Sequence, residues 1–476
     1  MMRVLSVASE CAPLVKTGGL ADVVGALPGA LMDLGCEMRT LLPGYPSVMA
    51  AVGAGKTVAR FDDLFGGPAE VMAAKTAGLD LLVLVADHLY DRPGGPYLDA
   101  TGQDWPDNAE RFAALSWAAA EIGADGAGGW RPDVVHGHDW QAGLVPEYLH
   151  ARDADVPFVF TIHNVAFHGN APGEKRPVLR LDPWRFTPER YEFWGQISAL
   201  KAGLTGADRI TTVSRTYAEE LMTPEFGMGM DGVLRERRRD LVGIVNGIDT
   251  EVWNPATDPA ITTYDTPRGK VPNTAALRDE FGLAPADGPL CVLVSRLSHQ
   301  KGIDLLLDAL PALTERGGQL ALLGSGDPGL EAALKSRADA DPNVAVRIGY
   351  DETLSHRMIA GGDAILVPSR FEPCGLTQLY GLRYGTVPLV ALTGGLADTI
   401  INASPAALAT GVATGVQFNP VNARALSNAF ARLCDLHRQP KVWNTLRQNG
   451  MKQPVGWATS ARAYHDLYAA CRTATA

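Results

Sequence analysis

The charged side chains best placed for chemistry lie in short turns between an apolar run and a helical pattern. Glu372 lies in the turn that follows the apolar run at 364–367, and the next helical pattern begins near Gly375. A carboxylate there can act as a base, a nucleophile, an acceptor for sugar hydroxyls, or only a helix cap. Because the N–H groups at a helix N-terminus favour anions, the position predicts a site for a negatively charged ligand.

Two cations follow another apolar run, at 290–295. Arg296 comes directly after this run, and Lys301 lies five residues further on. Arg can grip a diphosphate through two parallel hydrogen bonds, and Lys can neutralise its charge. A solvated surface loop is the other interpretation, because Arg and Lys are mostly exposed in proteins.

A turn near the start of the chain has a related design. Lys16 precedes a Thr-Gly-Gly turn, and the hexamer at 17–22 recurs at 393–398. Glycines let a backbone approach a ligand closely, and the following helix favours an anion. The order of lysine and glycines does not match a Walker A loop, and a tight turn without a ligand explains the same residues. The repeated turn suggests two similar halves that face one cleft.

Three histidines and an asparagine also lie at the ends of apolar runs. His136 and His138 are two residues apart, so on an extended segment both side chains point to the same face. A metal site is one interpretation, but no third ligand motif accompanies the pair. His163 and Asn164 follow the run at 157–162. A lone histidine is more often a structural group, whereas a position at a strand end favours a functional role.

Strand-like and helix-like segments alternate along the chain, which is typical of parallel, doubly wound α/β sheets. In such sheets functional residues gather at the carboxyl ends of the strands. A proline-rich segment near residues 246–272 separates two such series. The predicted strands lie at 4–8, 41–43, 79–86, 133–135, 157–162, 210–213, 242–245, 290–295, 319–323, 344–348, 364–367 and 387–391. Four of the polar residues that fall at strand ends are His136, Asp139, His163 and Ser214.

Length and composition limit the class of protein. A chain of 476 residues exceeds one typical hydrophobic core and predicts two domains. The formal net charge of −11 argues against a nucleic-acid binder, although we expect a local basic site for phosphate. Six cysteines without C-x-x-C spacing predict reduced thiols and a cytoplasmic location. The N-terminus lacks a signal-peptide pattern, and no apolar run reaches the ~20 residues of a membrane helix.

A series of short motifs spans nearly the whole chain. They are KTGGLAD at 16–22, HGHDW at 136–140, TIHN at 161–164, NGID at 246–249, SRL at 295–297 with QKG at 300–302, SRFEPCGL at 369–376 and TGGLADT at 393–399. In this order they resemble the ADP-glucose-dependent glycogen (starch) synthases of bacteria and plants. Each motif is weak alone, but together they are highly specific.

The resemblance implies a GT-B architecture, in which two Rossmann-like domains with parallel doubly wound sheets face a central cleft. It implies an N-terminal acceptor-side domain over residues 1–243 and a C-terminal nucleotide-sugar donor domain over residues 244–455. A C-terminal helix over residues 456–476 is expected to pack back on the first domain. The sequence supports this helix, because Tyr464, Leu467 and Tyr468 fall on one side of a helical pattern.

The resemblance also implies roles for individual residues. Arg296 and Lys301 would hold the donor diphosphate, while Glu372 would bind the glucose hydroxyls and help stabilise the developing cation. His163 would lie beside the reacting sugar, which completes the expected catalytic set. The expected substrate-binding residues are Lys16, Gly18, Gly19, Asp22, Tyr97, Asp139, Asn164, Asn246, Cys374, Gly375, Leu376 and Thr377.

The implied reaction is transfer of glucose from ADP-glucose to the 4-hydroxyl at the non-reducing end of glycogen or a malto-oligosaccharide, with retention at the anomeric carbon. A diphosphate leaves, so charge stabilisation can supply most of the catalysis without a strong general acid. The resemblance also implies that the reaction needs no metal or other cofactor. We expect neither a nucleic-acid nor a membrane partner.

Other functions fit the same motifs less well. A retaining enzyme of the same fold could use another nucleotide sugar or acceptor, and a pyridoxal-dependent phosphorylase fits this length poorly. A catalytically silent glucan-binding protein is the rival from another class. It would not need the five charged or imidazole side chains of Lys16, His163, Arg296, Lys301 and Glu372.

Overall fold

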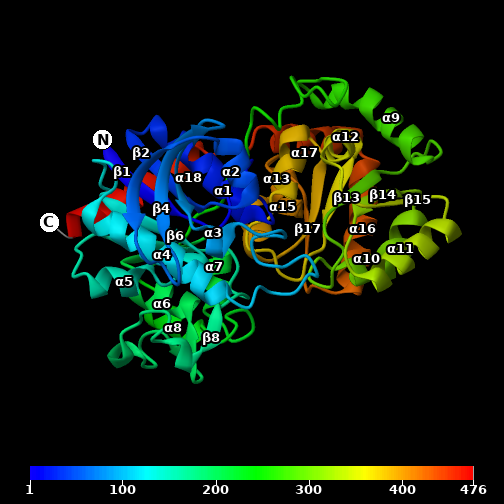
Figure 1. Cartoon of the computed structure of the whole chain (residues 1–476). Coiled ribbons are helices and arrows are strands. Elements are labelled where there is room, and N and C mark those ends of the chain that lie inside the picture. Colours follow the sequence, from blue (N-terminus) through cyan, green and yellow to red (C-terminus); the bar gives the residue numbers. More distant parts are fainter. Residues whose placement is uncertain (475–476) are drawn as a thin grey trace. The chain divides into compact units, whose positions relative to one another are not determined.

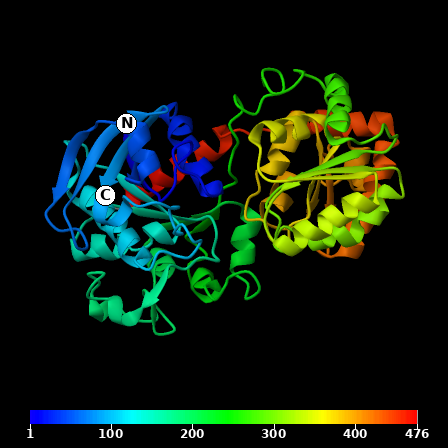
Figure 2. The same ribbon diagram turned by 45° about the vertical axis from the view of Figure 1, so that its right-hand side comes forward.

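The computed structural model describes residues 1–474 and divides the chain into two compact units. Unit 1 runs from Met1 to Asn246 and includes the C-terminal segment that begins at Trp457. Unit 2 runs from Gly247 to Gly456. In each unit, helices pack against a central sheet (Figures 1 and 2).

The large sheet of unit 1 has the strand order β12-β11-β7-β6-β1-β2-β5-β4-β3. β1 pairs in parallel with β2 on one side and with β6 on the other, so the strand order reverses at β1 and β6. Only β3, β4 and β5 pair in antiparallel fashion. The strands are β1 Met2–Val7, β2 Cys36–Pro43, β3 Lys56–Phe61, β4 Ala69–Thr76, β5 Leu79–Val85, β6 Val134–His138, β7 Phe158–Ile162, β11 Arg209–Thr212 and β12 Leu241–Gly243.

The sequence did not predict β3 and β4, which lie at the edge of this sheet. Both strands are interrupted by charged residues, Lys56 and Arg60 in β3 and Glu70 and Lys75 in β4, so neither shows the buried apolar run of a central strand. A smaller sheet in the same unit has the order β8-β10-β9. Its strands are β8 Asn170–Pro172, β9 Glu192–Phe193 and β10 Gln196–Ser198.

The helices of unit 1 follow the strands in βα alternation. They are α1 Gly19–Met32, α2 Pro46–Val52, α3 Asp87–Tyr90, α4 Asn108–Asp125, α5 Val145–Ala151, α6 Ala199–Gly206, α7 Arg215–Leu221, α8 Asp231–Glu236 and α18 Ala458–Ala474. Short 3-10 turns are η1 Trp140–Ala142, η2 Gly173–Lys175 and η3 Pro183–Arg185.

The sheet of unit 2 is entirely parallel and has the order β15-β14-β13-β16-β17-β18. This is the strand order of a Rossmann fold, and it reverses between β13 and β16. The strands are β13 Leu290–Val294, β14 Gln319–Gly324, β15 Val344–Ile348, β16 Ala364–Val367, β17 Val387–Ala391 and β18 Val416–Phe418. The first five confirm the sequence prediction, whereas the three residues of β18 are too few to give a pattern.

Helices connect these strands on the two faces of the sheet (Figure 1). They are η4 Pro267–Lys270, α9 Val271–Phe281, α10 Ile303–Thr314, α11 Pro328–Ala340, α12 Glu352–Gly361, α13 Thr377–Tyr384, α14 Gly394–Thr399, α15 Pro405–Ala409, α16 Ala423–His437 and α17 Pro440–Met451. Within residues 1–474, no helix combines the length and the apolar character needed to cross a membrane.

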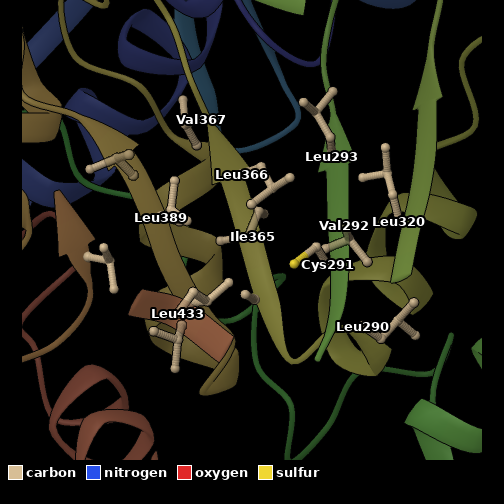
Figure 3. Packing of buried hydrophobic residues seen from close by; sticks show 14 of the residues in the cluster. Leu290, Cys291, Val292, Leu293, Leu320, Ile365, Leu366, Val367, Leu389 and Leu433 are labelled. Atoms are coloured by element: carbon tan, nitrogen blue, oxygen red, sulfur yellow. The ribbon is translucent and has the colours of Figure 1, made fainter. Parts of the chain in front are cut away.

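The core of unit 2 explains why its strands were visible in the sequence. A parallel sheet covered on both faces buries successive side chains, so its strands are continuous apolar runs. Figure 3 shows this packing, in which neighbouring strands and α16 supply aliphatic side chains. The labelled buried residues are Leu290, Cys291, Val292, Leu293, Leu320, Ile365, Leu366, Val367, Leu389 and Leu433.

The C-terminal helix α18 packs against α1 in unit 1. Tyr464 and Tyr468 are fully buried in a cluster with Val23 and Leu27 of α1, and Leu467 packs at its border. The helix therefore has the apolar side that its sequence predicts. Residues 475–476, the end of the helix expected from the sequence, lie outside the described residues.

A buried lysine ties three segments of unit 2 together. The Nζ of Lys270 donates hydrogen bonds to the carbonyl oxygen of Ala360 at 2.6 Å, that of Ile359 at 3.2 Å, and Oγ1 of Thr386 at 2.7 Å. Burial lowers the pKa of Lys270 well below its ordinary value. The two carbonyls belong to the last turn of α12, where a donor satisfies groups that the helix leaves free.

We expect Lys270→Ala to lower the free energy of unfolding of unit 2 by about 3 kcal/mol, because it leaves buried acceptors without a donor and opens a cavity. Urea unfolding measures the change. Lys335→Ala, at an exposed lysine of α11, is the matched control and should change the value by less than about 0.5 kcal/mol. Equal losses in the two variants would contradict the role of Lys270.

Candidate active site

Two loops meet where the strand order of unit 2 reverses. One follows β13 and contains Lys301; the other, the Glu372 loop (residues 368–376), follows β16. The backbone N–H of Arg370 donates to the carbonyl of Gln300 at 2.8 Å. Gly302 has a φ of +69°, and a Cβ there would lie 2.1 Å from the carbonyl oxygen of Pro368. Glycine is therefore required for the loops to approach this closely.

The Glu372 carboxylate is largely buried, yet it is well compensated. Lys301 Nζ lies 2.6 Å from Glu372 Oε2, and Ser369 Oγ donates to the same oxygen at 2.8 Å. The side chains of Lys301 and Glu372 are 19% and 10% exposed. A buried charge of this kind persists only with a partner and hydrogen bonds, so the two loops depend on each other.

The second glycine turn supports the Glu372 loop from behind. The N–H of Gly395 lies 3.1 Å from the carbonyl oxygens of both Glu372 and Pro373. Gly394 has a φ of +44°, and a Cβ there would lie 2.1 Å from the Glu372 carbonyl oxygen. The turn at Gly394 is thus a backbone support for Glu372.

Gln378, in the first turn of α13, holds the end of the same loop. Its Nε2 donates to the carbonyl oxygens of Cys374 at 3.1 Å and Gly375 at 2.9 Å. Gly375 has a φ of +70° and turns the chain toward the helix, which begins at Thr377 after Leu376. Helix α13 therefore begins a few residues after Glu372, and the N–H groups at its N-terminus can donate hydrogen bonds to an anion.

Arg296 lies at the carboxyl end of β13, on the same side of the sheet as the Glu372 loop. Its side chain is exposed, in contrast to that of Lys301. The two cations thus follow the same strand, but the ammonium of Lys301 is paired with Glu372, whereas the guanidinium of Arg296 is exposed. Binding of a diphosphate by these two cations stays a prediction from the sequence.

In unit 1, Glu10 occupies the glycine turn that the sequence singled out. Both the N–H and the hydroxyl of Thr17 donate to the Glu10 carboxylate, the hydroxyl at 2.6 Å, and the N–H of Gly18 donates at 3.3 Å. The chain's own carboxylate therefore fills the anion position of the turn before Gly19. Sequence reasoning missed Glu10, although an acidic residue just after a buried strand was a usable signal.

The flanking residues of this turn have further partners. Lys16 Nζ lies 2.7 Å from Asp22 Oδ1 in a partly exposed ion pair. Tyr97 OH donates to Glu10 Oε1 at 2.5 Å and lies 2.7 Å from Ser9 Oγ. Burial, and then the charge of Glu10, raises the pKa of Tyr97 well above its ordinary value. Tyr97 thus contacts Glu10 directly, whereas Lys16 and Asp22 pair with each other.

β6 and the end of β7 hold a histidine cluster, His136, His138 and His163. The prediction that His136 falls at a strand end is wrong, because β6 extends to His138 and His136 lies in its middle. His138 Nδ1 lies 3.0 Å from His163 Nε2, and the rings of His136 and His138 are 4.1 Å apart. Burial lowers the pKa of His136 and of His163 to about 3 and that of His138 well below its ordinary value. All three imidazoles are therefore neutral near pH 7, and none can act there as a cationic acid.

Asp139 fixes the backbone that carries His163. Its Oδ1 accepts the N–H of His163 at 2.7 Å and the N–H of Asn164 at 3.3 Å. Burial raises the pKa of Asp139 to about 7, although the two N–H bonds act in the opposite direction. Asn246, the last residue of this part of unit 1, is buried, and its Oδ1 has no hydrogen-bond partner among the described residues.

The structure thus gathers the expected site residues into two groups, one in each unit. Unit 2 contributes Arg296, Lys301, Glu372 and the start of α13; unit 1 contributes the Glu10 turn and the histidine cluster. Within residues 1–474, no group of three His, Cys, Asp or Glu side chains is arranged to hold a metal. Positive charge, neutral N–H donors and one ion-paired carboxylate can bind a sugar phosphate and stabilise charge as its bond breaks.

Comparison with known families gives consistent matches for both units. A model described as the starch synthase catalytic domain matches residues 3–236, and one described as glycosyl transferases group 1 matches residues 278–452. The chain is 72% identical to a glycogen synthase of Jannaschia sp. (strain CCS1), over 99% of each chain. It is 62% identical to a glycogen synthase of Paracoccus denitrificans (strain Pd 1222), again over 99% of each.

Solved structures agree with these matches. The catalytic domain of starch synthase IV from Arabidopsis thaliana, bound to ADP and acarbose, is 30% identical with a TM-score of 0.86, over 99% of each chain. Sucrose-phosphate synthase from Thermosynechococcus elongatus is 20% identical with a TM-score of 0.60, over 100% of each chain. At that identity the second similarity concerns the fold alone. The fold is GT-B, with two Rossmann-like domains, as the sequence predicted.

The raised pKa of Asp139 predicts how stability depends on pH. The protonated form is favoured in the folded protein, so its contribution is complete below the ordinary pKa of about 4 and is lost as pH rises through about 7. Asp139→Asn keeps an uncharged acceptor. We therefore expect the Asn variant to gain stability relative to the unsubstituted protein between pH 4 and pH 7, measured by urea unfolding. A difference that does not change with pH would contradict this.

Proposed function

Because the chain belongs to the glycogen (starch) synthase family, we propose that it transfers glucose from ADP-glucose to the non-reducing 4-hydroxyl of an α-1,4-glucan, with retention at the anomeric carbon. The observation that carries this proposal is the pairing of Lys301 with Glu372 where the strand order of unit 2 reverses. Ligands of Rossmann-like sheets bind at that point.

We assign donor binding to unit 2. Arg296 is exposed and free to grip phosphate oxygens, while Lys301 has three N–H donors and uses one on Glu372. The segment that leads into α13, from Cys374 to Thr377, supplies backbone N–H groups for the phosphates or the sugar. Glu372 then accepts hydrogen bonds from glucose hydroxyls and stabilises the cation that develops at the anomeric carbon.

We assign acceptor binding, and contacts with the reacting sugar, to unit 1. Neutral His163 offers a ring nitrogen to the sugar, with Asp139 holding its backbone. Tyr97 and Asn164 supply polar groups for sugar hydroxyls. Glu10 already accepts the N–H groups of Thr17 and Gly18, so we assign Lys16 as the charged donor of this turn. The remaining members of the proposed site are Gly18, Gly19, Asp22 and Asn246.

The proposed reaction breaks the bond from the anomeric carbon to the diphosphate and forms one to the acceptor oxygen. The acceptor hydroxyl loses its proton to the departing phosphate oxygen on the same face of the sugar. This route needs no acid, because Arg296 and Lys301 stabilise the leaving group. Glu372 is already bound to Lys301 and Ser369, which favours electrostatic stabilisation over nucleophilic attack by its carboxylate. Domain closure over the donor would exclude water.

We also propose that the protein acts in the cytoplasm. In the part of the chain that the structure describes, all six cysteines are buried and none forms a disulfide, which fits a reducing compartment.

We expect Glu372→Ala, Lys301→Ala and Arg296→Ala each to lower kcat by about a hundredfold or more, because each removes charge that acts in the transition state. Glucosyl transfer from ADP-glucose to glycogen measures the loss, and circular dichroism verifies folding. Lys335→Ala and Arg438→Ala are matched controls at exposed residues of the same unit and should keep full activity. Near-normal rates in folded site variants would remove those residues from the site.

A comparison of donors tests the substrate. We expect labelled glucose from ADP-glucose to enter glycogen in the presence of EDTA, because protein cations supply the charge that a metal supplies in other transferases. UDP-glucose under the same conditions should be a much poorer donor. Preference for UDP-glucose, or a requirement for magnesium, would contradict the proposed reaction.

A further inference from the structure

A buried serine and a buried histidine lie directly behind His163. Ser6, on β1, places its Oγ 3.1 Å from Nε2 of His138, and His138 places its Nδ1 3.0 Å from Nε2 of His163. Ser6 and His138 are 1% and 0% exposed. The three residues thus form a hydrogen-bonded chain that runs from Ser6 on β1 through His138 to the imidazole of His163, which we expect to be catalytic.

Both ring nitrogens of His138 are used within this hydrogen-bonded chain. His136 lies against its ring, but the two nitrogens of His136 are bound elsewhere, to Tyr468 OH at 2.8 Å and to Thr161 Oγ1 at 2.6 Å. His138 is therefore bound through its two nitrogens to Ser6 and His163. Asp139 holds the backbone of His163, so the side chain and the backbone of His163 are fixed by separate partners.

The number of N–H and O–H donors decides which atom donates in each hydrogen bond of this chain. A neutral imidazole carries one N–H and one acceptor nitrogen, whereas a serine hydroxyl can donate or accept. If His138 donated to Ser6, the buried Ser6 hydroxyl would have no acceptor among the described residues. An unmatched buried donor is costly. In the opposite direction, from Ser6 O–H to His138 Nε2 and from His138 Nδ1–H to His163 Nε2, the donors of both Ser6 and His138 have an acceptor.

We propose that His138, with Ser6 as its donor, is a positioning residue that fixes His163 as the neutral tautomer protonated at Nδ1. His163 then presents an N–H to the substrate and donates to a sugar hydroxyl or phosphate oxygen, and it is not a proton acceptor. This inference rests on the proposed function for the role of His163, whereas the tautomer itself is a property of the ligand-free protein.

The tautomers are measured directly by NMR on the full chain labelled with 15N-histidine, with His163 assigned from the signals lost in His163→Asn. We expect His163 and His138 both to be protonated at Nδ1 and unprotonated at Nε2 at pH 7. A His163 protonated at Nε2 would overturn the proposal.

Variants of His138 separate positioning from packing. His138→Leu removes the donor, so we expect a mixture of His163 tautomers and a kcat lower by about tenfold. His138→Asn carries an amide N–H near the former Nδ1 and should restore the Nδ1–H tautomer and most of the rate. Ser116→Ala, which deletes another buried hydroxyl, bonded to the Gln141 carbonyl at 3.2 Å, is the control and should change neither.

These measurements also distinguish this inference from the proposed function. A pure Nδ1–H tautomer in His138→Leu would overturn it, whatever the activity of the protein. Loss of activity in both variants with unchanged tautomers would show a structural role only, and would likewise overturn it. Absence of transfer from ADP-glucose by the unsubstituted protein would remove the proposed function and leave the tautomer result standing. Should the Leu variant not fold, the spectrum of the Asn variant decides, and Nε2 protonation of His163 there contradicts the proposal.

Discussion

The ion pair between Lys301 and Glu372 is the constraint on which the candidate site of unit 2 depends. A carboxylate that is 10% exposed needs a compensating charge, and the ammonium group comes from a different βα loop. The two loops must therefore keep one relative position. Gly302 allows their backbones to touch, Gly394 and Gly395 support Glu372 from behind, and Gln378 fixes the entry to α13. Few substitutions at these positions are compatible with the pair.

In unit 1 the buried histidine side chains of the candidate site are neutral and are stabilised by hydrogen bonds. Its histidines are deprived of charge by burial and satisfied by one another, by Ser6, by Thr161 and by Tyr468. Tyr468 belongs to α18, so the C-terminal helix reaches the cluster although more than three hundred residues separate it from β6 in the chain. The apolar packing of α18 on α1 thereby also bears on the site. Charge stabilisation is assigned to unit 2 and neutral hydrogen-bond donation to unit 1.

The formal net charge of −11 gives no sign of this difference between the charged groups of unit 2 and the neutral histidines of unit 1. Arg296 and Lys301 both follow β13, with Lys301 paired to Glu372, whereas the turn after Lys16 is already filled by Glu10. Two turns that share six residues thus differ in function: one surrounds a carboxylate of the chain, and the other supports the backbone of Glu372. The shared residues do not give a shared backbone shape either, because Gly18 has a φ of −155° and the equivalent Gly394 has a φ of +44°.

The sequence by itself determined the α/β class, five of the six strands of unit 2 and the helix at the C-terminus. These features depend on local apolar periodicity, which is visible along a chain. The half-exposed edge strands β3 and β4 have no such signal. Only the tertiary structure decided that Glu10 fills the Lys16 turn, that Ser6 and His138 lie behind His163, and that Gly395 supports Glu372. Each of those contacts joins residues brought together by strand pairing or loop closure, and hydrogen-bond partners distant in sequence leave no periodic pattern.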